Sequence, residues 1–135
     1  MGSIRKEIAL TARPDDVWDA VRDIGALHTR LVPGFVVDTK LDGDARIVTF
    51  ANGMTIREPI VAIDEQQRRL VWSAEGGQLM HYNASAQVFA NGDGAATLVW
   101  TADFLPHDAA AFIDGMMEQG AAAMKTAFAA NRPPR

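Results

Sequence analysis

The sequence predicts an α+β domain in which an antiparallel β-sheet packs against one long C-terminal helix. Three observations support this prediction. Residues 35–104 alternate between apolar and polar side chains with a period of two, in runs separated by turn sequences rich in Gly, Asn and Asp. Residues 106–130 instead repeat apolar side chains at spacings of three, four and seven, which is typical of a helix. A short helical pattern also follows the first strand.

The chain length favours a single domain over residues 1–135. A chain of 135 residues buries about two thirds of its unfolded surface around one core. Residues 131–135 read NRPPR, and because two prolines cannot continue a helix, we expect them to form a frayed tail.

The N-terminal elements have clear boundaries. Residues 3–11 alternate as a strand. Pro14 suits the first turn of a helix that we expect to run to about Asp23, and the two aspartates after it complement the positive end of the helix dipole. Gly25 favours a stop before a second short helix over 26–32.

The central region is predicted to be a meander of six or seven strands in total. Pro59 lies inside one run, where it removes a backbone donor, so we expect a bulge or an edge there. The predicted strands are 35–40, 45–50, 54–63, 68–74 and the two arms of a hairpin around the turn 91–94.

The last hairpin presents an unusually small inward face. Alternation places four alanines on it, together with larger side chains. Such a face does not fill the space above it, so either a cavity or bulky helix side chains such as Met116, Met117 and Phe128 must occupy the room. The inward residues are Met80, Tyr82, Ala84, Ala86, Val88, Ala96, Leu98, Trp100, Ala102 and Phe104.

Composition argues against several classes of function. The net charge of −4 disfavours nucleic-acid binding, and the absence of cysteine excludes thiolate chemistry. The three histidines have no metal-ligand spacing, so we expect neither a metal nor a cofactor. Charges at the N-terminus and the lack of a long apolar run predict a cytoplasmic protein without membrane insertion. A homodimer is left open.

The order of elements resembles that of a known superfamily. The segments PDDVWDAVRDIGALHTRLVPGF, REPIVAIDEQQRRLVWS and ATLVWTADFLP, with the long helix after them, are similar to the START-like, or Bet v 1-like (SRPBCC), superfamily. Within it the chain most resembles the bacterial polyketide cyclase/dehydrase and lipid-transport branch. The resemblance covers nearly the whole chain and includes no catalytic signature.

This resemblance implies a helix-grip fold, in which a curved sheet wraps around the C-terminal helix and encloses a cavity for an apolar small molecule. The alanine face would then be the cavity floor. The function we expect is binding of an apolar or aromatic, lipid- or polyketide-like ligand. Two alternatives stay open: an enzyme of the cyclase or dehydratase kind, and a protein-interaction module of the sort found in other branches.

Glu58 is the candidate catalytic residue. Alternation places it on an inward face with Met54, Ile56 and Ile60, where burial would raise its pKa and suit it to act as a general acid or base. A structural role, in which Glu58 pairs with a cation or another donor, explains the same pattern. Lys6 is the one inward-facing cation that we identified as a partner for it.

The candidate ligand-binding residues are mostly aromatic or flexible apolar side chains. Trp72, Tyr82 and Trp100 combine a large apolar body with one polar group, which suits a ring-containing ligand. The methionines of the last helix form an adaptable apolar wall. His28, in the second short helix, would lie near the cavity entrance of the resembling family. The full set is His28, Trp72, Tyr82, Ala84, Ala86, Trp100, Met116 and Met117.

Overall fold

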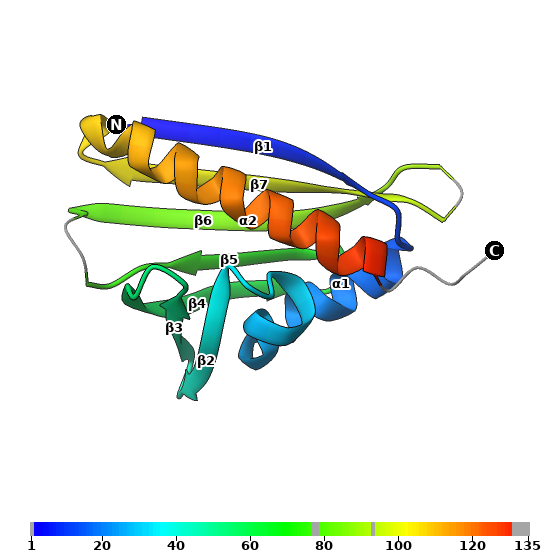
Figure 1. Cartoon of the computed structure of the whole chain (residues 1–135), viewed down its shortest axis with the longest axis horizontal. Coiled ribbons are helices and arrows are strands. Elements are labelled where there is room, and N and C mark those ends of the chain that lie inside the picture. The colour runs from blue at the N-terminus through cyan, green and yellow to red at the C-terminus, as the bar shows by residue number, and fades with distance from the viewer. Residues whose placement is uncertain (1, 77–78, 93, 131–135) are drawn as a thin grey trace.

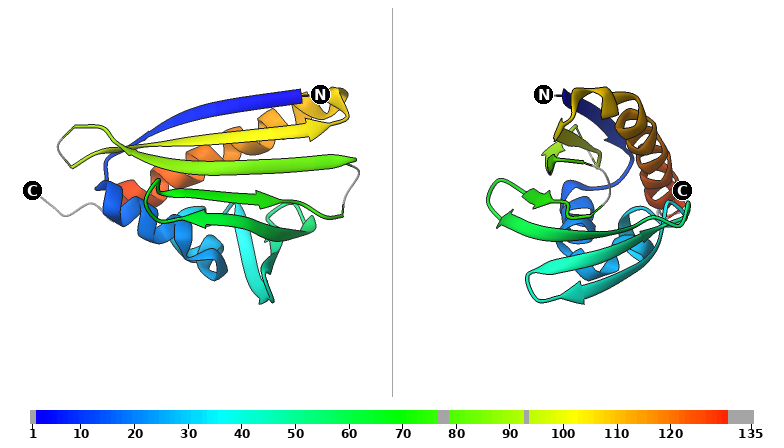
Figure 2. Two further views of the ribbon diagram at one scale, coloured as in Figure 1. Left: turned by 180° about the vertical axis from the view of Figure 1, so that it is seen from behind. Right: turned by 90° about the vertical axis from the view of Figure 1, so that its left-hand side faces the viewer.

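The computed structural model describes residues 2–76, 79–92 and 94–130, and the predicted C-terminal tail lies outside them. One antiparallel sheet of seven strands, in the order β1-β7-β6-β5-β4-β3-β2, is crossed diagonally by the long helix α2 (Figure 1). The strands are β1 Gly2–Leu10, β2 Val36–Asp42, β3 Ala45–Phe50, β4 Thr55–Asp64, β5 Arg69–Ser73, β6 His81–Ala90 and β7 Ala96–Leu105. Seen along its length, the sheet curves around α2 (Figure 2), which confirms the predicted helix-grip fold.

The segment between β1 and β2 is helical, as predicted. Helix α1 spans Pro14–Arg22, begins at its proline and buries the side that carries Val17 and Trp18. The predicted second helix consists of a 3₁₀ turn, η1, at Ile24–Ala26 and one π-helical turn, η2, at Leu27–Leu31.

The β6–β7 hairpin has the register that alternation predicts. Ala84 lies opposite Ala102 and Ala86 opposite Trp100, and these three alanines have at most 4% of their surface exposed. Met80 is an error of the prediction, because it is 80% exposed. It precedes the first residue of β6 and lies in a bend, where a period of two no longer determines the direction of a side chain.

The irregularity expected at Pro59 is present. Strand β4 pairs with β3 as far as Pro59, which lies opposite Ala45. It then pairs with β5 from Ile60 onward, and the register shifts between Ile60 and Ala62. This change of partner within one strand coincides with a bulge, a feature that bends and twists a sheet.

Helix α2 spans Ala110–Ala130 and follows a 3₁₀ turn, η3, at His107–Ala109. Its buried side includes Ile113, Met117, Gly120 and Met124, which recur at helical spacing. Lys6 links β1 to α2 through two ion pairs. Its Nζ atom lies 2.6 Å from an Asp114 oxygen and 2.5 Å from a Glu118 oxygen. None of the described helices is both long enough and apolar enough to cross a membrane.

Gly120 allows α2 to approach the sheet closely. A Cβ atom at this position would lie 2.8 Å from two atoms of the Trp100 ring and 3.2 Å from the Phe35 ring. Only a glycine leaves room for both rings here. The backbone of α2 therefore rests directly on two aromatic side chains.

Candidate functional site

A cavity of about 690 Å³ lies between the sheet and the N-terminal half of α2. The sheet contributes side chains from β3, β4, β6 and β7, the segment after β5 contributes others, and the helix contributes one face of its first two turns. Nearly all of the lining is apolar. The described lining residues are Phe35, Phe50, Met54, Thr55, Ile56, Ala74, Gly76, Leu79, Tyr82, Trp100, Pro106, Asp108, Ala109, Phe112, Ile113, Met116 and Met117.

Three aromatic side chains close the inner end of this cavity. Phe35 and Phe50 meet edge to face with ring centroids 5.2 Å apart, and Trp100 lies beside them against α2. All three also border a second space of about 60 Å³ deeper in the core. They therefore form an aromatic wall between a large cavity and a small internal void.

The small void is bordered by apolar side chains and by one buried ion pair. Leu70, Trp72, Ala86 and Met124 are among its neighbours, as are Arg46 and Glu58. A volume of about 60 Å³ is on the scale of two water molecules. It is too small for a ring-containing ligand, so the large cavity is the candidate binding site.

Glu58 is buried, as predicted, and pairs with Arg46 from the neighbouring strand. Arg46 donates a hydrogen bond from Nε to Oε1 of Glu58 over 2.9 Å, with 3% and 9% of the two side chains exposed. The guanidinium carbon lies 5.4 Å from the centre of the Trp72 ring, within the range of a cation–π contact. Burial raises the pKa of the Glu58 carboxyl group, and the charge of Arg46 opposes this shift.

The partner of Glu58 differs from the one that sequence reasoning identified. Lys6 binds the acidic residues of α2 instead. Arg46 was the missed residue, although a signal was present: Arg46, Val48 and Phe50 share one face of β3 by alternation, and Arg46 lies directly opposite Glu58. Because cross-strand pairs share a face, an inward Arg next to an inward Glu could have been recognised once the strand register was known.

The structure distributes the predicted ligand-binding residues over several environments. Tyr82, Trp100, Met116 and Met117 line the large cavity. Trp72 and Ala86 border the small void. Ala84 is 2% exposed, opposite Trp72 and Ala102 on the adjacent strands, and belongs to neither described lining.

His28 lies in η2 and also belongs to neither lining. Its Nδ1 atom is buried, and no described residue forms a hydrogen bond with it.

The alanine face is not the floor of the large cavity, since none of its four alanines lines it and Ala86 alone borders the small void. The alanines are buried in the same hydrophobic core as Met117 of α2, with Trp100 packed against it. The large cavity is displaced toward the β3–β4 turn, where sequence reasoning did not select Phe35, Phe50 or Met54. A signal for part of this lining was available, since Met54 and Ile56 share the face of Glu58 by alternation.

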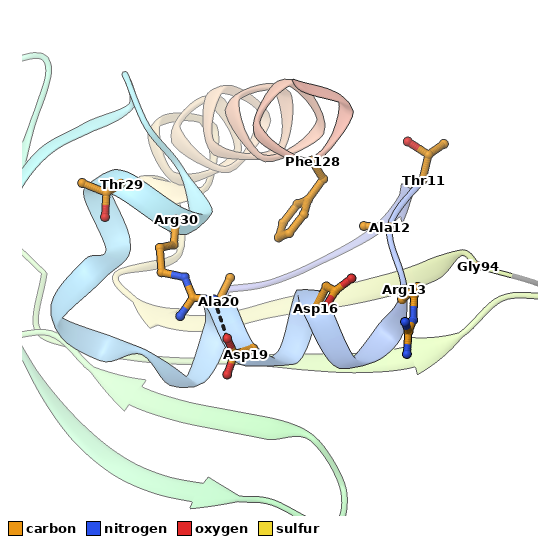
Figure 3. A pocket seen from close by; sticks show the side chains of 10 residues that line it. All are labelled: Thr11, Ala12, Arg13, Asp16, Asp19, Ala20, Thr29, Arg30, Gly94 and Phe128. Atoms are coloured by element: carbon orange, nitrogen blue, oxygen red, sulfur yellow. Dashed lines mark hydrogen bonds and ion pairs between the residues drawn. The ribbon is translucent and has the colours of Figure 1, made fainter. Parts of the chain in front are cut away.

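A second hollow of about 590 Å³ lies outside the core, between α1, the end of β1 and the C-terminal end of α2 (Figure 3). Phe128 points into it from α2, but Arg13, Asp16, Asp19 and Arg30 form much of its rim. Arg30 is bound by Asp19 at 2.5 Å and by Asp23 at 2.9 Å. Because charged side chains form much of its rim, this hollow suits an apolar ligand less well than the large cavity does.

The described residues contain no group of three or more His, Asp or Glu side chains placed to hold a metal ion.

Comparisons with known proteins agree with this architecture. A model of the family described as "Polyketide cyclase / dehydrase and lipid transport" matches residues 1–129. No curated protein matches the chain.

Among solved structures, the protein XoxI from Bacillus cereus is 20% identical with a TM-score of 0.84, over 95% of this chain and 96% of the other. Norcoclaurine synthase from Thalictrum flavum, in complex with dopamine and hydroxybenzaldehyde, is 18% identical with a TM-score of 0.72, over 98% and 88%. The di-domain ARO/CYC BexL from the BE-7585A biosynthetic pathway is 13% identical with a TM-score of 0.80, over 93% and 46%. At these identities the likeness shows the fold.

Proposed function

Because the chain belongs to the polyketide cyclase/dehydrase and lipid-transport family, we propose that it binds an apolar or aromatic small molecule in the cavity between the sheet and α2. The observation that carries this proposal is the cavity of about 690 Å³ with its apolar lining. Ligand sites in proteins commonly measure about 300–1,000 Å³ and combine such a lining with a few polar groups.

Two of the similar structures are compatible with a ring-containing ligand. One, norcoclaurine synthase, holds dopamine and hydroxybenzaldehyde, and another, BexL, is an ARO/CYC protein of a biosynthetic pathway. In the present chain the large cavity offers Phe35, Phe50 and Trp100 at its inner end. Aromatic pairs gain energy beyond the area that they bury, so these side chains favour a flat ligand.

Tryptophan fluorescence provides a direct test. Titration with a hydrophobic naphthalene fluorophore should change the intrinsic emission saturably, and Trp100→Phe should remove most of this change because Trp100 lines the cavity. Trp18→Phe is the matched control, since Trp18 lies on α1, is buried and belongs to neither described lining of the core cavities. A response that persists in Trp100→Phe and disappears in Trp18→Phe would place binding elsewhere and contradict the proposal.

The alternative function is catalysis by Glu58. Its support is the raised pKa of a buried carboxyl group, a common property of general acids. Its position favours a carrier, however, because Glu58 borders the small void behind the aromatic wall and is held by Arg46. Turnover of a cavity ligand that is lost in Glu58→Gln, with the fold and binding intact, would establish the enzyme instead.

The other alternative, a protein-interaction module, would need a continuous exposed apolar surface. The exposed large apolar side chains lie on several elements, including Val37 and Leu41 of β2, Val61 and Ile63 of β4, Phe89 of β6 and Phe112 of α2. This scatter supports the small-molecule proposal over a docking surface.

A further inference from the structure

The charge of the cavity wall restricts the chemistry of the ligand. Of the seventeen described lining residues, Asp108 is the one with a charged side chain, and it is exposed. No Lys, Arg or His is among them. An anionic group inside this cavity would therefore meet no counter-ion from the described lining.

Three cations on the elements around the cavity are already bound by acidic side chains. Arg46 is bound to Glu58, and Lys6 is bound to Asp114 and Glu118. Arg57 of β4 is bound to Asp42 and Glu75 at 3.0 and 2.9 Å. Since a buried, unpaired carboxylate carries a desolvation penalty of several kcal/mol, a ligand carboxylate entering from water would bind weakly.

Tyr82 is the polar side chain of the cavity lining that is best suited to bind a ligand. Its side chain lines the cavity, and no hydrogen bond from a described residue reaches its hydroxyl group. Burial, and then the negative charge of Glu58, raise the pKa of this phenol, so the hydroxyl group stays protonated and able to donate. A purely apolar ligand would cover this donor without satisfying it, which disfavours such a ligand.

The other polar groups of the cavity are less suited to this role. Thr55 is exposed and lies at the start of β4, on the rim. The indole Nε1 of Trp100 also lacks a described partner, but it is covered by its neighbours.

We propose that the natural ligand is an uncharged molecule with a largely apolar body and one oxygen that accepts a hydrogen bond from Tyr82, and that the cavity rejects carboxylates. This inference rests on the proposed binding function and specifies the class of ligand. Ketones, esters and ethers with a ring or chain fit it, whereas molecules that carry an ionised carboxylate into the cavity do not.

Three probes with the same ring system test this selectivity: 2-ethylnaphthalene, 2-acetylnaphthalene and 2-naphthoate. Calorimetric titration of the unmodified protein at neutral pH should show that the ketone binds about fivefold more tightly than the hydrocarbon, the gain expected for one hydrogen bond. The carboxylate should bind more weakly than the ketone by about tenfold or more.

Tyr82→Phe removes the hydroxyl group and keeps the ring. In this variant the ketone should no longer bind more tightly than the hydrocarbon. Thr55→Val removes the other side-chain hydroxyl group of the described lining and serves as the control, in which the advantage should persist. Infrared spectroscopy tests the same hydrogen bond in the unmodified protein. The carbonyl stretch of ¹³C-labelled 2-acetylnaphthalene should have a lower frequency when the ketone is bound than when it is dissolved in a hydrocarbon solvent.

Each outcome bears on one of the two proposals. Tightest binding of 2-naphthoate, or a ketone advantage that survives in Tyr82→Phe, would overturn the inference while leaving the binding function in place. A bound ketone whose carbonyl stretch has the same frequency as in a hydrocarbon solvent would also overturn the inference and leave the binding function in place. Failure of all three probes to bind would contradict the binding function itself, and the inference with it.

Discussion

Ala84 and Ala74 show how the same small residue can have two different roles. Ala84 is 2% exposed and packed in the sheet, whereas Ala74 follows β5 and lines the cavity. Ala84→Leu should destabilise the protein by about 1–3 kcal/mol, because it overpacks a filled region. Ala74→Leu should occupy empty space, with little effect on stability and a marked loss of probe binding.

Urea unfolding and fluorophore titration of both variants check this pair. An Ala84→Leu protein as stable as the parent would show that space remains above the alanine face. An Ala74→Leu protein with undiminished probe affinity would show that the cavity is not the binding site.

Glu58 should make stability depend on pH in a defined direction. Because its folded pKa is raised, the folded state takes up a proton there at a higher pH than the unfolded state. The stability that protonated Glu58 contributes is fully present below its unfolded pKa, about 4.3, and is lost as the pH rises through the folded pKa. Glu58→Gln should not show this loss, and should gain stability relative to the parent as the pH rises.

Urea unfolding across this pH range measures the effect. The control is Glu75→Gln, which removes an exposed partner of Arg57 and should cost less than about 1 kcal/mol. A Gln variant that instead becomes less stable than the parent as the pH rises would mean that Arg46 outweighs burial and holds the pKa of Glu58 low.

At the scale of elements, the contact between α2 and the sheet depends on Gly120. Gly→Ala in a helix normally stabilises by about 1 kcal/mol, and Gly115→Ala should do so, because no atom lies within 4 Å of the added Cβ. At Gly120 the same change brings a Cβ within 2.8 Å of Trp100. The overpacking should outweigh the helix gain, so Gly120→Ala should lower the melting temperature.

Thermal unfolding of the two variants decides the point. If Gly120→Ala stabilised the protein as much as Gly115→Ala, Trp100 would not lie against the helix, and the aromatic wall would be misplaced.

The elements themselves could be predicted from local patterns. Alternation with a period of two gave the strands, Pro14 marked the start of α1, and Pro59 marked the irregularity in β4. Gly25, expected as a stop, lies instead inside the turn η1. These signals act over a few residues. The pairing of Glu58 with Arg46 required the β3–β4 register, which local patterns do not specify.

The candidate site could be predicted only in part, for the same reason. Tyr82, Trp100, Met116 and Met117 line the cavity because they belong to the inward faces of regular elements. The place of the cavity depends on how Phe35 and Trp100 fill the space beneath α2, which is a property of three-dimensional packing. Phe35, expected to begin the strand 35–40, lies instead in the turn before β2.

At the scale of the whole molecule, the curved sheet and α2 enclose an apolar space that the side chains do not fill. The helix is fixed over the sheet by Lys6 at one edge and by the Gly120 contact at its centre. The cavity lies beside these contacts, toward the β3–β4 turn. This arrangement leaves room for the proposed ligand while the rest of the core remains packed.

Native mass spectrometry of freshly purified protein tests this central claim most directly. The account predicts a discrete added mass of one small molecule per chain, which is lost on denaturation and is reduced in Ala74→Leu. Incubation of ligand-free protein with 2-acetylnaphthalene should restore a one-to-one complex. A protein that carries no added mass and forms no complex with this probe would contradict the claim that the cavity is a binding site.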